Sequence, residues 1–172
     1  MTQPELALLQ AASRESIRGP SAAENCGVSV PSKKKKLILL ADDEEEFRTL
    51  FKEIAKKRGY SCEVVTSADE FFSHLKGQKR SKPDLIVLDI QMEDEDAGLR
   101  VLDQIKGRKQ GRLRSTPTIM VSQSLKYRDV CESYRRGASV FIRKTRDQRA
   151  NRANLNEALK FWNGESIQFC DD

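Results

Sequence analysis

The chain has 172 residues, of which 38% are hydrophobic and 33% charged, and its formal net charge is +5. This length suits one domain with a core and tails, and it is too short for two domains of ordinary size. No apolar run approaches the roughly 20 residues of a membrane-spanning helix, and the apolar residues at 5–9 are too few for a signal peptide. We therefore expect no membrane-embedded role and a cytoplasmic location.

The cysteine and histidine content indicates neither a zinc site nor a disulfide framework. There is one histidine, and the four cysteines lie far apart without a Cys-x-x-Cys pair. We expect the cysteines to be small hydrophobic residues that stay reduced.

Composition divides the chain into three parts. Residues 1–34 are rich in Ala, Ser, Glu and Gln with little apolar patterning, which predicts a disordered tail. A basic run, Lys33–Lys36, joins this tail to the first apolar segment. Residues 35–163 are the predicted folded domain, and residues 164–172 are a short C-terminal tail.

From Leu37 onward, short apolar runs alternate five times with segments of helical period, as in α/β proteins. The first, third and fourth runs are continuously apolar, which indicates parallel strands covered on both faces. We predict a three-layer, doubly wound, parallel five-stranded sheet. The predicted strands are 37–40, 62–65, 85–88, 118–121 and 140–142.

Apolar residues at helical spacing between the strands predict one buried stripe on each helix. The stripes are Phe47, Leu50, Phe51 and Ile54; Phe71, Phe72 and Leu75; Val101, Leu102 and Ile105; Tyr127, Val130, Cys131 and Tyr134; and Leu155, Ala158, Leu159 and Trp162. Gly77 and Gly107 mark predicted helix ends.

Polar residues follow four of the predicted strands. They are Asp42 and Asp43 after the first, Asp89 after the third, Ser122 after the fourth and Lys144 after the fifth. Functional groups of an open parallel sheet collect at the carboxyl ends of its strands, so we expect these five side chains to converge. Each alone could be a helix cap or a turn residue, but all five together favour a site.

The residue types at these strand ends suit phosphoryl chemistry. Three neighbouring carboxylates repel one another unless a cation lies between them. Mg²⁺ prefers a few carboxylate oxygens together with water and phosphate oxygens. The hydroxyl and the amine could then hold a phosphoryl group placed on one carboxylate.

Four segments, LILLADDEEEF, PDLIVLDIQM, TPTIMVSQS and GASVFIRK, resemble the motif blocks of bacterial response-regulator receiver domains of the CheY-like type. The resemblance covers most of the chain. It implies a flavodoxin-like (βα)₅ fold with strand order 2-1-3-4-5. It also implies phosphoryl transfer from the phosphohistidine of a sensor histidine kinase or phosphotransfer protein to an aspartate.

Carried over by position, the resemblance implies a role for each site residue. Asp89 would be the phosphoryl acceptor, and it would bind Mg²⁺ together with Asp42 and Asp43. The other implied roles are a metal ligand in the backbone carbonyl of Gln91, phosphoryl contacts from Ser122 and Lys144, and a switching ring in Phe141. The implied output surface is the fourth helix, fifth strand and fifth helix, with self-phosphorylation and self-dephosphorylation as the only catalysis.

Three features depart from the family pattern. The loop from Glu93 to Gly98 lacks the usual proline and is one residue longer, so we expect a more acidic and more mobile loop. Thr145 replaces the proline that usually follows the lysine, and we expect a trans bond and a rearranged turn there. Gln123 stands beside the phosphoryl pocket in place of a small residue, and we expect it to restrict water. We expect Gln123 and Glu93 to form the rim of this pocket.

Three other functions are weighed against a receiver. A haloacid-dehalogenase-like phosphohydrolase would need an aspartate where Gln91 stands. An adaptor of receiver shape would bind partners without phosphorylation. A nucleic-acid-binding module is suggested by basic residues that no helix-turn-helix or zinc-finger pattern accompanies, and these also lie over much of the predicted output surface. They are Arg108, Lys109, Arg112, Arg114, Arg135, Arg136, Arg146, Arg149 and Arg152.

Overall fold

The computed structural model describes residues 35–76, 82–109, 111–124 and 126–165. The predicted tail at 1–34, the helix end at Gly77, and all but the first two residues of the predicted C-terminal tail lie outside these ranges. Within them, no helix combines the length and the apolar character needed to cross a membrane.

Five parallel strands form one sheet in the order β2-β1-β3-β4-β5. This confirms the predicted fold and strand order, and each strand lies within two residues of its predicted bounds. The strands are β1 (Leu37–Ala41), β2 (Ser61–Val65), β3 (Leu85–Asp89), β4 (Thr118–Ser122) and β5 (Val140–Arg143).

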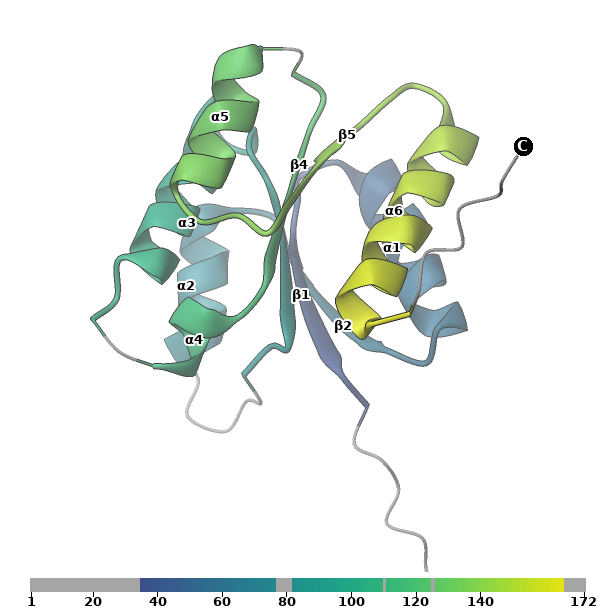
Figure 1. The fold of residues 1–172 in the computed structure, drawn as a ribbon, viewed down its shortest axis with the longest axis horizontal. Coiled ribbons are helices and arrows are strands. Elements are labelled where there is room, and N and C mark those ends of the chain that lie inside the picture. The colour runs from purple at the N-terminus through teal and green to yellow at the C-terminus, as the bar shows by residue number, and fades with distance from the viewer. Residues whose placement is uncertain (1–34, 77–81, 110, 125, 166–172) are drawn as a thin grey trace, which may run out of the picture. The chain divides into compact units, whose positions relative to one another are not determined.

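Helices cover both faces of the sheet, which completes the predicted three layers (Figure 1). Helices α1 and α6 lie on one face, and α2, α3, α4 and α5 lie on the other. The helices are α1 (Glu45–Lys57), α2 (Ala68–Lys76), α3 (Ala97–Lys106), α4 (Arg112–Ser115), α5 (Tyr127–Arg135) and α6 (Gln148–Asn163). The sequence did not predict α4, because a single turn is too short to show a period.

The hydrophobic core has two parts, one on each face of the sheet. Alternate residues of β1 supply both parts: Ile38 and Leu40 pack toward α1 and α6, and Leu39 and Ala41 pack toward α2 and α3. All five residues of β1 and of β3 are buried, as continuous apolar strands predict. The predicted stripes of α1 and α3 are also buried.

The stripe predicted for α5 is wrong. Tyr127 is 81% exposed, Tyr134 is 50% exposed and Cys131 is exposed, whereas Asp129 and Ser133 face the protein interior. A helical period shows which residues share a side of the helix, but it does not show which side faces the sheet. The buried hydroxyl of Ser133 donates to the carbonyl of Asp129, so a polar inner face is satisfied within the helix itself.

Candidate functional site

Three aspartates meet at the carboxyl ends of β1 and β3. Each of Asp42, Asp43 and Asp89 has a carboxylate oxygen within 4.8 Å of such an oxygen on the other two. The pairing of β1 with β3 produces this arrangement, because Ala41 lies opposite Leu88 and the aspartates come next in each chain segment. Asp42 and Asp89 are buried and Asp43 is exposed, so the cluster opens to solvent on one side.

Backbone hydrogen bonds hold one oxygen of each buried carboxylate. Oδ1 of Asp89 accepts from the N–H of Gln91 at 3.1 Å, and Oδ1 of Asp42 accepts from the N–H of Glu44 at 2.9 Å. The guanidinium of Arg48 donates to the backbone carbonyls of Asp42 and Asp43 and holds the loop after β1. The second oxygen of each buried carboxylate remains for other partners.

Lys144 supplies the positive charge of the site. Its Nζ lies 2.5 Å from Oδ2 of Asp89 and 2.7 Å from Oδ2 of Asp42, and the lysine is only 3% exposed. Nζ of Lys144 lies over the ring of Phe47, 4.4 Å from the ring centroid. Although this ammonium is close to Oδ2 of Asp42, the angles between the two groups do not suit a hydrogen bond. No other described residue donates a hydrogen bond to this oxygen. A buried carboxylate oxygen without a donor is a ready metal ligand.

The electrostatics of the pocket also favour a bound cation. Burial is the main cause that raises the pKa of Asp89 to about 7, and it outweighs the lowering effect of Lys144. Burial likewise raises the pKa of Asp42. Burial lowers the pKa of Lys144, but the charges of Asp89 and Asp42 outweigh it, and the net change is upward. Two buried carboxylates thus share one ammonium, and a divalent cation fits the remaining charge and oxygen donors.

Ser122 ends β4 beside this cluster and is fully buried. Its carbonyl accepts from the N–H of Lys144 at 2.8 Å, and its Oγ accepts from the N–H of Ser124 at 3.0 Å. No described residue accepts a hydrogen bond from this hydroxyl, so its hydrogen is available to a ligand.

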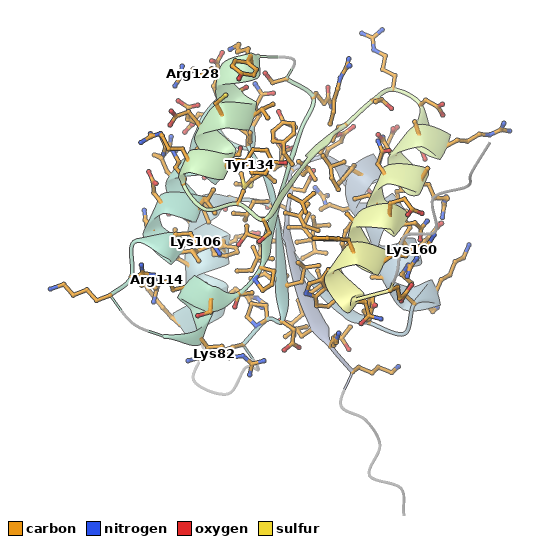
Figure 2. The ribbon with its side chains drawn as sticks, in the orientation of Figure 1. Lys82, Lys106, Arg114, Arg128, Tyr134 and Lys160 are labelled. Atoms are coloured by element: carbon orange, nitrogen blue, oxygen red, sulfur yellow. The ribbon has the colours of Figure 1, made fainter. Side chains whose placement is uncertain are left out.

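Phe141 lies on β5, half-buried against the core on the α2 and α3 face. Its backbone N–H donates to the hydroxyl of Tyr134 at 3.2 Å. Figure 2 shows Tyr134 between α5 and β5. The predicted switching ring is therefore joined through its backbone to the outward-facing side of α5.

The acidic loop after Asp89 is held at several points. Glu93 accepts from the N–H of Ala68 at the start of α2, at 2.9 Å. Asp94 accepts two hydrogen bonds from the guanidinium of Arg100, which with its backbone contacts lowers the pKa of Asp94 to about 2. The loop that we predicted to be mobile thus contacts both α2 and α3, and the Glu93 side chain, expected at the pocket rim, is hydrogen-bonded to the start of α2.

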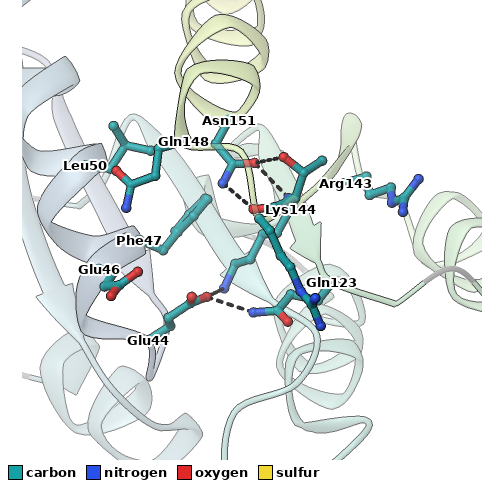
Figure 3. Close-up of a pocket in the computed structure, with 11 residues that line it drawn as sticks. Glu44, Glu46, Phe47, Leu50, Gln123, Arg143, Lys144, Gln148 and Asn151 are labelled. Atoms are coloured by element: carbon teal, nitrogen blue, oxygen red, sulfur yellow. Dashed lines mark hydrogen bonds and ion pairs between the residues drawn. The ribbon is translucent and has the colours of Figure 1, made fainter.

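The turn after Lys144 begins with the trans peptide bond that we predicted. The structure has no cis peptide bond in its described residues, so the bond to Thr145 is trans. The buried side chain of Asn151 replaces the constraint of a proline (Figure 3). Its Oδ1 accepts from the N–H of Thr145, and its Nδ2 donates to the carbonyl of Thr145, both at 2.8 Å.

A pocket of about 520 Å³ lies beside Lys144, between α1, the loop after β4 and the turn after β5. Figure 3 shows Gln123 at its edge, where Nε2 donates to Oε2 of Glu44 at 3.1 Å. The same Oε2 lies 3.4 Å from Nζ of Lys144. Gln123 is exposed and lines this pocket, whose described lining residues do not include the three aspartates. Its partner Glu44 was not foreseen.

Comparison with known proteins shows which family has this architecture. A family model of the response regulator receiver domain matches residues 38–160. The chain belongs to the response-regulator receiver family. Receivers bind a divalent metal at an acidic pocket, and the aspartate cluster is such a pocket. Among curated protein sequences, no relative matches this receiver.

Solved structures share the fold of this receiver at low sequence identity. The phosphorylated cyanobacterial phytochrome response regulator RcpA is 23% identical, with a TM-score of 0.69 over 77% of this chain and 97% of that chain. The Mn²⁺-bound response regulator Rcp1 is 23% identical, with a TM-score of 0.68 over 78% of this chain and 98% of that chain. The receiver domain of NtrX from Brucella abortus is 26% identical, with a TM-score of 0.60 over 75% of this chain and 99% of that chain.

Gly98 is a receiver residue whose role the sequence analysis missed. A Cβ at this position would lie 1.9 Å from the carbonyl oxygen of Asp89. The N–H of Gly98 also donates to the carbonyl of Ile90 at 3.0 Å. Helix α3 therefore begins directly on the backbone of Asp89. The available signal was a glycine in the first turn of a helix, where it is otherwise unfavourable.

Proposed function

We propose that this receiver acts in the cytoplasm and accepts a phosphoryl group on Asp89 from the phosphohistidine of a histidine kinase or phosphotransfer protein. Mg²⁺ would be held by Asp42, Asp43, Asp89 and the backbone carbonyl of Gln91. The observation that carries the proposal is the buried ammonium of Lys144, 2.5 Å from Asp89 inside a cluster of three carboxylates. The likeness to the phosphorylated RcpA and the Mn²⁺-bound Rcp1 supports it.

In this transfer a carboxylate oxygen of Asp89 attacks phosphorus. The bond between phosphorus and the donor nitrogen breaks, and its electron pair returns to the imidazole. The bound metal would neutralise charge on the phosphoryl oxygens. Lys144 would pair with one phosphoryl oxygen and the Ser122 hydroxyl would donate to another. The chain would catalyse only its own phosphorylation and dephosphorylation.

We place the output surface on α5, β5 and α6. These are the fourth helix, fifth strand and fifth helix of the family resemblance, because the single-turn α4 adds one to the helix numbering here. The outward aromatic residues of α5 support this choice, because exposed Tyr127 and Tyr134 offer contact area to a protein partner. Phe141 links this face to the sheet through Tyr134. The added phosphoryl charge of about −1.5 to −2 would bias the position of this surface.

The basic residues lie partly over the expected output surface. Five of the nine belong to α5, α6 or the segments next to them: Arg135, Arg136, Arg146, Arg149 and Arg152. Arg108 and Lys109 follow α3, and Arg112 and Arg114 belong to α4, outside α5, β5 and α6. Several of the others are already paired within the receiver: Arg135 and Arg136 with Glu132, and Arg152 with Glu53. This scatter does not favour a nucleic-acid-binding groove over a protein-binding surface.

The direct test is phosphorylation with a small donor. The protein is incubated with acetyl phosphate and Mg²⁺, and its intact mass is measured. We expect one phosphoryl adduct in the wild type and none in Asp89→Ala or in the presence of a chelator. Failure of the wild type to form an adduct, both with acetyl phosphate and with a phosphorylated histidine phosphotransfer domain, would favour a phosphorylation-independent adaptor.

We further predict that Gln123 slows the loss of the phosphoryl group. Its side chain stands beside Lys144 at the edge of the pocket, where its bulk would restrict the approach of water to phosphorus. The half-life of the phosphorylated protein, followed by intact mass after donor removal, should be shorter in Gln123→Ala. An unchanged or longer half-life would argue against this role.

A further inference from the structure

Glu44 has a side-chain position that its place in the chain does not explain. It is the N-cap residue of α1, where a side-chain oxygen usually accepts an N–H of the first helical turn, yet its carboxylate makes no such bond. The carboxylate extends instead toward Lys144 at 3.4 Å and Gln123 at 3.1 Å (Figure 3). Its contacts therefore serve the phosphoryl pocket and not the helix.

The ammonium of Lys144 donates hydrogen bonds to Asp89 and Glu44 and forms a close ion pair with Asp42, so carboxylates surround it on three sides. The distances from Nζ to the carboxylate oxygens are 2.5 Å for Asp89, 2.7 Å for Asp42 and 3.4 Å for Glu44. A phosphoryl group on Asp89 would need a place beside this ammonium, which one of the three carboxylates would have to give up. Asp89 and Asp42 are buried and held by backbone hydrogen bonds, whereas the side chain of Glu44 is 38% exposed. Glu44 is the partner that can leave at the lowest cost.

We infer that Glu44 is a positioning residue that competes with the phosphoryl group for Lys144 and couples occupancy of the pocket to Gln123. When the phosphoryl group arrives, its negative charge repels the Glu44 carboxylate and takes its place on the ammonium. Because Glu44 also holds Gln123, its departure releases the loop that connects β4 to α5. This deepens the proposed function and rests on it.

This arrangement joins two distant parts of the chain. Glu44 belongs to the start of α1, and Gln123 lies one residue after β4, on the loop that leads into α5. Among the described residues, Glu44 is the only hydrogen-bond partner of the Gln123 side chain. The Glu44 carboxylate thus holds the entrance of α5 only while Lys144 is free of a phosphoryl group.

The test compares Glu44→Gln with Glu45→Gln, which removes the same charge one residue away. Glu45 is exposed and contacts neither Lys144 nor Gln123 in the described structure. We expect Glu44→Gln to raise the initial rate of phosphorylation by acetyl phosphate, and the affinity for beryllofluoride with Mg²⁺, about twofold to fivefold over Glu45→Gln. Equal values in the two variants, or lower values in Glu44→Gln, would overturn the inference.

A second readout follows the coupling to Gln123 by NMR. In the wild type, beryllofluoride should shift the side-chain amide resonance of Gln123 toward the position that this resonance has in Glu44→Ala. In Glu44→Ala itself, beryllofluoride should leave the resonance unmoved. A wild-type resonance that does not move when beryllofluoride binds would overturn the coupling. A wild type that neither forms an adduct nor binds beryllofluoride would instead refute the proposed function.

Discussion

Substituting Gly98 with alanine is expected to lower the free energy of unfolding by about 3 kcal/mol or more. The new Cβ would lie 1.9 Å from the carbonyl oxygen of Asp89 and 2.9 Å from the Cα of Ile90, and both neighbours are backbone atoms of a buried segment. Neither can move aside by rotating a side chain, so α3 or the end of β3 must shift. Urea denaturation followed by circular dichroism measures the loss.

Gly59→Ala is the matched control for this substitution. Gly59 has φ of +75° and nothing within 4 Å of an added Cβ, so its replacement costs only backbone strain, roughly 1 kcal/mol. Gly98 is not among the glycines with positive φ, so the need there is for space alone. Equal losses in the two variants would contradict the close contact between α3 and Asp89. Because that contact also positions the acceptor, any folded Gly98→Ala protein should be phosphorylated more slowly.

Much of the fold and the central site were predictable because each depends on a short-range pattern. Continuous apolar runs specify buried parallel strands, and parallel strands bring their carboxyl ends to one edge. Asp42, Asp89 and Lys144 could therefore be placed together without knowledge of any side-chain torsion. The same reasoning placed Ser122 beside them, and the structure confirms that it ends β4.

The orientation of α5 was not predictable, because its sequence offers two possible inner faces. Tyr127, Cys131 and Tyr134 make the more hydrophobic side, but Asp129 and Ser133 are small enough to pack inward with their polar groups satisfied locally. Tyrosine also tolerates exposure, since its hydroxyl is polar. Packing against the rest of the receiver decided between the two faces, and periodicity alone carries no information about it.

The contacts of Glu44 and Asn151 were also out of reach of the sequence. Glu44 lies in a run of three glutamates, and nothing in that run distinguishes the one that reaches Lys144, 100 residues away. Asn151 is the residue that substitutes for a proline constraint after Lys144, yet it lies within α6, where asparagine gives no special signal. Such pairings depend on the three-dimensional meeting of loops that are far apart in the chain.

Replacing Lys144 with methionine is expected to lower the free energy of unfolding by about 3–5 kcal/mol in metal-free buffer. The substitution keeps a long apolar side chain against Phe47 but leaves Asp42 and Asp89, 0% and 4% exposed, without their cation. The measurement is made near pH 8, above the pKa of about 7 of Asp89, so that its carboxylate is charged in the wild type. Without Lys144, which lowers this pKa, the pKa of Asp89 rises further, and the loss then includes the cost of protonating the carboxylate. Urea denaturation of the variant and the wild type gives the difference directly.

Excess MgCl₂ should recover part of this loss, because an ion that binds the folded state alone stabilises it and here also supplies the missing positive charge. Lys52→Met is the control: Lys52 is exposed on α1 without an ion pair among the described residues, and its replacement should change stability by about 0.5 kcal/mol or less. If Lys144→Met were no less stable than Lys52→Met, the ammonium would not be balancing the buried carboxylates. If Mg²⁺ stabilised neither the wild type nor Lys144→Met, the aspartate cluster would not be the proposed metal site. If Mg²⁺ stabilised Lys144→Met more than the wild type, lysine and metal would be shown to neutralise the same two carboxylates.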